Sequence, residues 1–307
     1  MPSKLSPCIR GRRTTLPVSH TEAMMDDCNE AKGSTMLASF PMFDFEELHS
    51  AHDALWSTIA DGLRTRGIDA PVALSRPEVP LSRHWRRPEL LFSQTCGFPY
   101  AAYYRPHLKL IGTFHYSLPV DDGPGYYRSL IVARSADRRV APDPVATDLR
   151  AFSGATVAIN NRDSLSGCVS LGVTLLDRGV EHIGDVVVTG AHTDSLGEMQ
   201  AGRVDLAIID ALTFALLADV RPRAVDGVTV IGSGPRIPCT PLVTAQRDLV
   251  EPIQAVLPVA LARLALEAPS VLRALRIRAF VAHTDEDYAP TIPMGERASE
   301  LMPVAEE

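Results

Sequence analysis

The sequence contains no uncharged apolar run long enough to cross a membrane. The longest, residues 252–262, is far shorter than the roughly 20 residues that a transmembrane helix needs. Residues 1–33 mix acidic and basic side chains and lack the apolar core of a secretory signal. We therefore predict no membrane span and a cytoplasmic location for the chain as written. A periplasmic location applies if an export signal is missing from this sequence.

Cysteine pairs and positive charge are also scarce. The five cysteines are widely scattered, with no Cys-x-x-Cys and no histidine at zinc-finger spacing, so we expect neither a disulfide framework nor a metal site. The sequence has thirty Lys plus Arg and thirty-seven Asp plus Glu, which gives a net charge of −7. The chain as a whole thus lacks the positive field that nonspecific nucleic-acid binding requires, and we predict no nucleic-acid partner.

Common enzyme motifs are missing as well. There is no Gly-x-Ser-x-Gly elbow, Walker A sequence, Gly-x-Gly-x-x-Gly after a strand or His-Glu-x-x-His. Asp205 lies in an apolar strand with no evident basic partner, so it does not form a convincing acid/base pair with Asp210. Of the three lysines, only Lys109 lies outside the N-terminal segment and could hold a pyridoxal cofactor. We predict no catalytic residues and no cofactor.

The residues that are present predict an ordered α/β protein. The 307 residues are 46% apolar, enough for two domains of about 150 residues. The first apolar run starts at Met36, so we expect residues 1–34 to form a disordered or extended tail. Asp44 and Glu47 have capping-box spacing, and apolar residues then recur at helical steps to Leu63. A strand at 72–74 would complete a βαβ unit.

Further strands and helices alternate along the chain. We expect a strand at 228–231 that leads back to the first block, followed by a helical segment at 246–278 that is interrupted by prolines. This order predicts two α/β lobes joined by more than one crossover. We expect strands at 90–92, 109–112, 130–133, 155–160, 185–189 and 204–210, and helices at 165–178, 195–202 and 211–219.

Residues directly after strands are the first candidates for a site, since ligands of such sheets bind outside the carboxyl ends of the strands. Ser164, Ser166 and Gly167 lie between a strand and a helix. Two hydroxyls and a helix N-terminus there would suit a small oxyanion, and glycine would let the ligand approach the backbone. The alternative is that the serines only cap the helix.

Two further polar residues follow neighbouring strands. His192 would point into the same crevice, although a lone histidine is more often a structural hydrogen-bonding group. Ser195 and Glu198 have capping-box spacing, which would explain the adjacent polar cluster without a ligand. Asp210 ends an apolar strand, where a carboxylate needs a partner. A ligand amine or the N-terminus of the next helix could each supply one.

The first block offers a second set of candidates. Gln94 and Thr95 follow a strand and could contact a ligand, and Tyr100 could form a wall of the pocket. Met42 and Phe43 follow the first strand and could supply the opposite apolar wall. They could instead form a hydrophobic staple for the helix that begins at Asp44.

Taken together, these motifs resemble the phosphate/phosphonate-type substrate-binding proteins of ABC transporters, which have the type II periplasmic-binding-protein fold. Asp163-Ser-Leu-Ser-Gly167 is similar to the Asp-Ser-x-Ser-Gly anion loop of this family, and the other motifs follow in the expected order. Phe43 stands where relatives commonly have tyrosine, which removes one hydroxyl. The remaining motifs are 38–43, 93–100, 126–129, 190–192 and 204–210.

The resemblance implies two lobes, each a mixed sheet flanked by helices, that close on a ligand in the cleft between them. Lobe one would comprise residues 35–123 plus 226–307 with the helical C-terminal segment, and lobe two residues 124–225. Ser164, Ser166 and His192 would hold an oxyanion. By position, Phe43, Gln94, Thr95 and Tyr100 would line lobe one, with Gly167 in the anion loop and Asp210 near the other end of the ligand.

The function that the resemblance implies is non-catalytic binding of a small oxyanionic solute such as phosphate or a phosphonate. The chain would serve an ABC-type uptake system, with a transporter permease as its protein partner, or act as a cytoplasmic sensor. The alternative is an enzyme on the same two-lobed fold. It would be similar to the thiamine-pyrimidine synthesis relatives, or a hydrolase that uses Ser164 or Ser166 with His192.

Overall fold

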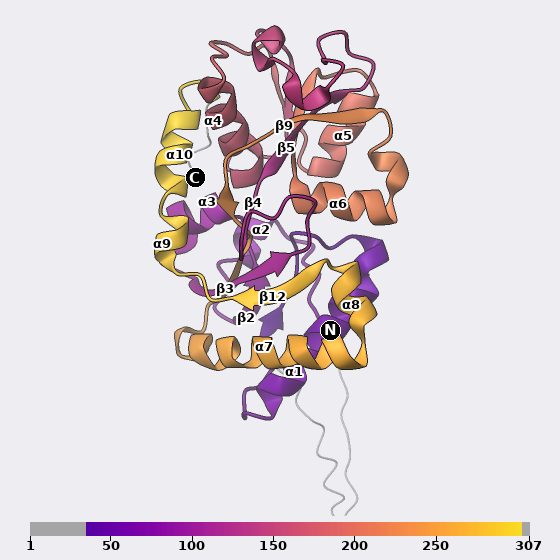
Figure 1. Cartoon of the computed structure of the whole chain (residues 1–307). Coiled ribbons are helices and arrows are strands. Elements are labelled where there is room, and N and C mark those ends of the chain that lie inside the picture. Colours follow the sequence, from indigo (N-terminus) through magenta and orange to yellow (C-terminus); the bar gives the residue numbers. More distant parts are fainter. Residues whose placement is uncertain (1–34, 303–307) are drawn as a thin grey trace, which may run out of the picture. The chain divides into compact units, whose positions relative to one another are not determined.

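A computed structural model describes residues 35–302, so the expected tail at residues 1–34 lies outside the described residues. Two five-stranded mixed sheets form the framework (Figure 1), which confirms the predicted two-lobed α/β class. The first sheet has the order β1-β2-β11-β3-β12 and contains one parallel pair, β1 with β2. Its strands are β1 (Leu37–Ala38), β2 (Leu90–Gln94), β3 (Lys109–Tyr116), β11 (Pro241–Thr244) and β12 (Ile277–Val281).

The second sheet has the order β7-β6-β8-β5-β9, and β6 pairs in parallel with both β7 and β8. Strand β5 pairs antiparallel with β8 and with β9. Because β9 belongs to this sheet, the expected end of lobe two at residue 225 is too early. The strands are β5 (Ser129–Arg134), β6 (Val157–Ile159), β7 (Val186–Val188), β8 (Leu206–Asp210) and β9 (Val228–Ser233).

Helix α1 (His49–Arg64) buries the apolar face that its sequence spacing predicts, against α7 (Val250–Glu267) and α8 (Pro269–Ala274). It starts later than expected, after a 3-10 turn at Glu46–Leu48. The predicted capping box is wrong, because Asp44 pairs instead with Arg76 (Nε to Oδ2, 3.1 Å). No strand forms at residues 72–74.

Helix α7 continues through Pro258, so the expected interruption there is wrong. Together with the turn before it, the segment Arg247–Glu267 is long and apolar enough to cross a membrane by length and composition alone. However, one face of α7 packs on α1 and β3 and buries six apolar residues, among them Leu257 and Leu264. One third of this apolar window is buried inside the protein, so one face of α7 belongs to the lobe-one core.

The helices of lobe two begin at the ends of strands that face the cleft. A π-helical turn (Leu165–Val169) runs into α4 (Ser170–Asp177), while α6 (Ala211–Val220) follows β8 directly. Helix α5 (His192–Gln200) starts three residues earlier than predicted. Ser195 is therefore not its cap, and its hydroxyl lies 2.7 Å from that of Thr189.

Two of the segments that cross between the lobes pair with each other as β4 (Tyr126–Tyr127) and β10 (Ile237–Pro238). Ion pairs add to this connection: Arg221 of lobe two binds Glu47 at 2.6 Å, and Arg276 of lobe one binds Asp219 at 2.8 Å. The two lobes are therefore in direct contact.

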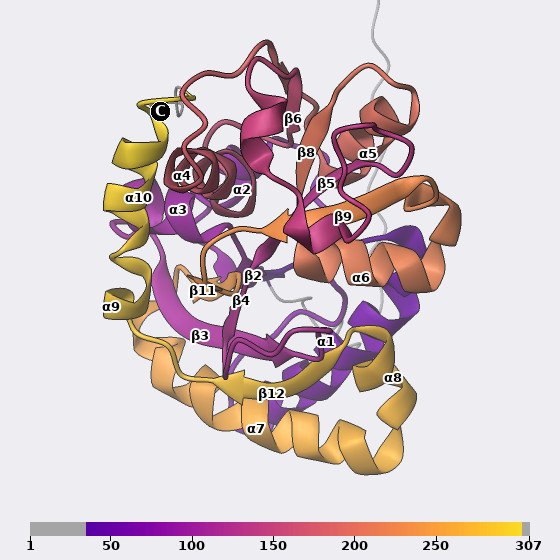
Figure 2. The same cartoon turned by 45° about the horizontal axis from the view of Figure 1, so that its top comes forward.

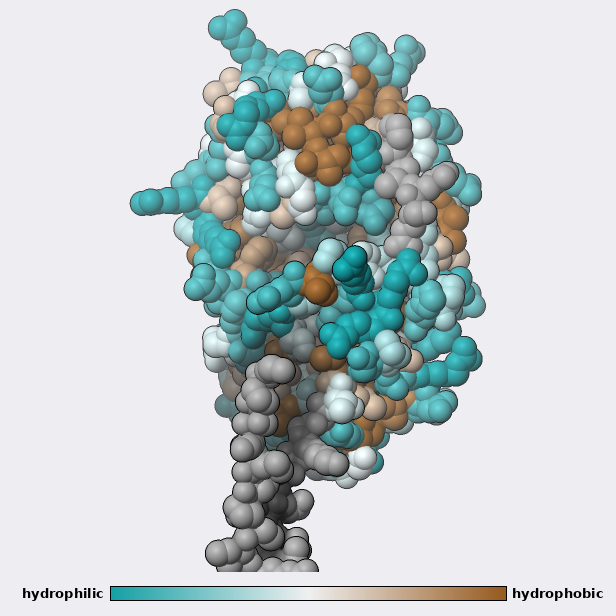
Figure 3. Space-filling model, turned by 180° about the vertical axis from the view of Figure 1, so that it is seen from behind, coloured by the Kyte–Doolittle hydropathy of each residue, from teal (hydrophilic) through white to brown (hydrophobic). Residues whose placement is uncertain are grey.

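The C-terminal segment, expected in lobe one, forms α9 (Asp285–Tyr288) and α10 (Thr291–Ala298). Figure 2 shows α10 beside α4 of lobe two, but α9 and α10 also pack on residues 97–104 of lobe one, so the C-terminal segment contacts both lobes. Hydrophilic residues cover much of the face in Figure 3, where one hydrophobic patch lies in the upper part. The short remaining elements are α2 (Leu81–His84), α3 (Gly97–Pro99), a π turn at Tyr100–Tyr104 and 3-10 turns at Pro144–Ala146, Leu149–Phe152, Pro222–Ala224 and Arg247–Leu249.

Candidate functional site

A cavity of about 590 Å³ lies between the two lobes and is lined by residues from both. Its lobe-two side carries polar residues that follow strands β6, β7 and β8. Its lobe-one side is mostly apolar and aromatic, with Pro41, Met42, Phe43, Phe45, Trp85 and Tyr104 among the lining residues. The structure therefore brings together the lobe-two residues that were predicted from their positions after strands, although these residues lie far apart in the sequence.

The serine loop, residues 163–167, lies at the N-terminus of the helical segment 165–177, in which the backbone of Gly167 departs from helical angles. Ser164 is the N-cap, since its Oγ accepts a hydrogen bond from the N–H of Gly167 at 3.1 Å. Capping thus explains Ser164, but it does not explain Ser166, whose hydroxyl lies 3.5 Å from that of Ser164 and lines the cavity. A Cβ on Gly167 would lie 2.0 Å from Oδ1 of Asn160, so glycine is required for this close packing.

His192 is held between a backbone carbonyl and Ser166. Its Nδ1 lies 3.1 Å from the oxygen of Ile208, and its Nε2 lies 3.1 Å from Oγ of Ser166. Burial lowers the pKa of His192 to about 4, so the ring is neutral at pH 7. Because a carbonyl can only accept, Nδ1 carries the proton and Nε2 accepts the hydroxyl hydrogen of Ser166.

Asp210 lines the cavity and also caps α6. Its Oδ1 accepts from the N–H of Thr213 at 2.9 Å, and its Oδ2 accepts from the hydroxyl of Tyr127 at 2.5 Å. Burial raises the pKa of Asp210, and these hydrogen bonds oppose the shift only in part. The capping alternative considered from the sequence is thus present in the structure.

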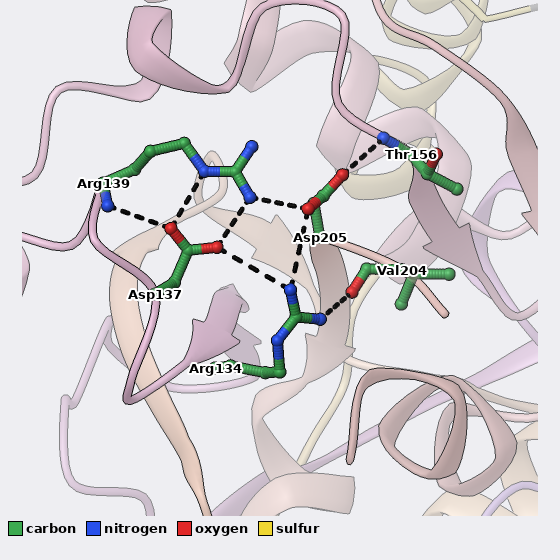
Figure 4. Close-up of polar contacts among 6 residues, drawn as sticks. All are labelled: Arg134, Asp137, Arg139, Thr156, Val204 and Asp205. Atoms are coloured by element: carbon green, nitrogen blue, oxygen red, sulfur yellow. Dashed lines mark hydrogen bonds and ion pairs between the residues drawn. The ribbon is translucent and has the colours of Figure 1, made fainter. Parts of the chain in front are cut away.

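Asp205 lies at the opposite end of strand β8, and the expectation that it has no basic partner is wrong. Figure 4 shows its carboxylate beside Arg139 and Arg134, at 2.6 and 3.7 Å. Burial alone would raise its pKa, but the hydrogen bond from Arg139 and one from the N–H of Thr156 lower it below the ordinary value.

The predicted lobe-one residues divide into two groups. Phe43 and Met42 line the cavity as expected, but Gln94, Thr95 and Tyr100 do not. The hydroxyl of Tyr100 donates to Asp285 at 2.6 Å, away from the cavity. The side chain of Gln94 donates to Tyr116 at 3.3 Å, and it lines a much smaller cavity behind Phe43. Thr95 is fully buried.

Sequence reasoning missed several lining residues, among them Trp85, Tyr104 and Asn160. Trp85 and Tyr104 lie outside every segment that follows a predicted strand, so nothing marked them. Asn160 does follow strand β6, and this position was the available signal. Its Oδ1 is buried without a hydrogen-bond partner.

In the described range 35–302, no Arg or Lys side chain lines the cavity. A positive charge there could come only from protonation of His192. Over the same range, no three His, Cys, Asp or Glu side chains gather in a way that could hold a metal ion. An anion bound here would rely on hydroxyl groups, the imidazole and the helix dipole.

Fold and site together define a two-lobed periplasmic-binding protein with a ligand cavity between its lobes. Residues 92–288 match the model of the family described as "ABC transporter, phosphonate, periplasmic substrate-binding protein". The chain belongs to this family of solute-binding components of ABC uptake systems. It is therefore a binding protein, and both enzyme alternatives were wrong. The family description places its members in the periplasm.

Solved structures agree on the fold. The chain is similar to PhnD1 from Prochlorococcus marinus in complex with methylphosphonate, with a TM-score of 0.66, 11% identity and coverage of 87% of this chain and 98% of that one. A binding protein component of an ABC phosphonate transporter from Pseudomonas aeruginosa gives a TM-score of 0.62 at 17% identity, covering 86% and 88%. The chain is also similar to the protein XAC2383 from Xanthomonas citri bound to ATP, with a TM-score of 0.58, 13% identity and coverage of 89% of this chain and 100% of that one. The comparison with curated proteins gave no match.

Proposed function

We propose that the chain binds a phosphonate or phosphate group in the interlobe cavity, with its oxygens on the hydroxyls of Ser164 and Ser166 and on His192. The observation that carries this proposal is the contact between Oγ of Ser166 and Nε2 of His192 (3.1 Å). This contact lies at the N-terminus of the helical segment that Ser164 caps. Both groups lie on the cavity surface, and helix N-termini favour anions.

The remaining predicted residues take supporting roles in this proposal. Phe43 forms part of the apolar wall, and Gly167 leaves room for Asn160 beside the serine loop. Asp210 caps the start of α6 beside the cavity. Gln94, Thr95 and Tyr100 support the lobe-one wall without contact to the ligand.

The protein would deliver its ligand to the permease of an ABC transporter, and its site of action would be the periplasm. This follows from the family, whose members serve phosphonate transporters there. The PhnD1 relative, whose solved complex contains methylphosphonate, supports the phosphonate assignment.

Removing both hydroxyls tests the proposal. We expect Ser164→Ala with Ser166→Ala to weaken the binding of methylphosphonate or phosphate in titration calorimetry by several kcal/mol at most, since a hydrogen bond to a charged group contributes about 1.5–3 kcal/mol. The matched control is Ser135→Ala, an exposed serine beyond the far end of β5, which should leave the affinity unchanged. Equal affinities in the double variant and the parent would exclude the serine loop as the anion site.

A further inference from the structure

The lobe-one wall of the cavity differs sharply from the lobe-two wall that faces it. On lobe one, aromatic and aliphatic side chains dominate, and they include Met42, Phe43, Phe45, Leu81 and Trp85. The two carboxylates on the lining, Asp163 and Asp210, both belong to lobe two. A ligand whose oxyanion rests on the serine loop would therefore direct its substituent at an apolar surface.

The cavity is also far larger than an oxyanion needs. At about 30 Å³ for each water-sized group, the five heavy atoms of methylphosphonate fill no more than about 150 Å³. The cavity measures about 590 Å³, within the range of about 300–1,000 Å³ for drug-sized ligands.

The lobe-one wall offers little to a positively charged substituent. Both lining carboxylates, Asp163 and Asp210, belong to lobe two, and no charged side chain lines the cavity from the lobe-one residues that the structure describes. An ammonium group would have to lie against the apolar wall and lose its water, which is costly for an unpaired charge. An uncharged ring would instead replace water on apolar surface, which is favourable.

We infer that the ligand is an organophosphonate or phosphate monoester with a bulky, uncharged and largely apolar substituent, and that aryl groups suit the lobe-one wall best. This inference rests on the proposed oxyanion site and adds the class of substituent. Phosphonates and phosphate monoesters present the same terminal oxygens. They differ in whether carbon or oxygen joins the substituent to phosphorus, and the experiment below distinguishes the two.

Titration calorimetry with five ligands tests the inference: phosphate, methylphosphonate, 2-aminoethylphosphonate, phenylphosphonate and phenyl phosphate. We expect phenylphosphonate or phenyl phosphate to bind at least tenfold more tightly than methylphosphonate and 2-aminoethylphosphonate. The tighter of the two phenyl compounds identifies the link. Methyl- or aminoethylphosphonate binding as tightly as both phenyl compounds would overturn the inference. If none of the five binds, or if the serine variant binds all of them normally, the proposed oxyanion site fails and the inference fails with it.

A polar substitution on the apolar wall provides a second measurement. Met42→Gln, or Leu81→Gln if the first variant is unstable, should reduce the preference for the phenyl over the methyl compound at least threefold. Val259 on the exposed face of α7 is 65% exposed, so Val259→Gln is the matched control and should leave this ratio unchanged. An unaltered ratio in both wall variants would show that the substituent does not contact lobe one, and would overturn the inference.

Discussion

Strand β8 has a carboxylate at each end, and the two ends differ in how that charge is compensated. At the end far from the cavity, Asp205 accepts hydrogen bonds from Arg139 and Thr156, and Arg134 lies nearby (Figure 4). At the cavity end, Asp210 has only a hydroxyl and a backbone N–H as partners. The pKa of the first is lowered and that of the second is raised.

The difference separates stability from ligand binding. Full charges paired at the far end hold the loop after β5 against the sheet, because Asp137 of that loop also binds Arg139 at 2.6 Å. At the cavity end no Arg or Lys of the described residues lines the cavity, so an anion must bind through hydroxyl groups, the imidazole and the helix N-terminus.

The largest effect on stability should follow removal of the shared arginine at the far end. Arg139→Ala would leave Asp137 and Asp205 without their main partner and would remove the guanidinium from the ring of Phe152. Loss of one partner from a buried pair costs about 3–5 kcal/mol. We expect about 2–3 kcal/mol in the free energy of unfolding, because these side chains are about one third exposed.

Urea unfolding of Arg139→Ala and Arg138→Ala measures this effect. Arg138 is the neighbouring residue and is exposed, so its removal should cost less than about 0.5 kcal/mol. Equal losses in the two variants would mean that the far-end network adds nothing to stability, and the contrast between the two ends would disappear.

Much of the fold could be predicted because its signals are local. The spacing of apolar residues in α1 and the alternation of strands with helices in lobe two appear directly in the sequence. Strand β11 escaped prediction, since it is four buried residues long and begins with Pro241. Helix α10 was missed because its packing on α4 comes from tertiary contact.

The candidate site divides along the same line. Ser164, Ser166 and His192 could be placed together because the carboxyl ends of neighbouring parallel strands meet at one edge of a sheet. Tyr100 could not be placed, because its partner Asp285 lies 185 residues further along the chain. The same holds for Asp205, whose arginine lies 66 residues earlier.

Protonation of His192 is expected to bring charge to the cavity end only when a ligand is present. In the free protein the ring is neutral above its pKa of about 4, and Nε2 accepts the hydroxyl hydrogen of Ser166. A protonated ring would donate to Ser166 and free that hydroxyl to bind the anion. The bound anion should thus raise the pKa of His192, and affinity should increase as pH falls from the bound value toward about 4.

One proton taken up on binding changes the affinity by up to tenfold, or about 1.4 kcal/mol, for each pH unit in this window. Calorimetry from pH 4.5 to 8 in buffers of different ionisation enthalpy measures the proton count. Since the ligand titrates as well, the slope of the parent is compared with that of His192→Gln, and exposed His182→Gln serves as the control. A slope in His192→Gln identical to that of the parent would show that the cavity end stays uncharged with the ligand bound.

The smallest effect should come from removing the charge at the cavity end of β8. Asp210→Asn keeps an oxygen that can cap α6, and asparagine caps helices about as well as aspartate. Because the folded state raises the pKa of Asp210, its ionisation costs stability as pH rises above the unfolded value. The substitution removes this cost, so at pH 7 the free energy of unfolding should change by less than about 1 kcal/mol or increase slightly. Asp205→Asn, which loses two arginine contacts, should cost about 1–2 kcal/mol. Urea unfolding of both variants at pH 7 measures the two free energies of unfolding. A larger decrease for Asp210→Asn than for Asp205→Asn would contradict the prediction, because it would show that the charge of Asp210 has a partner as strong as Arg139.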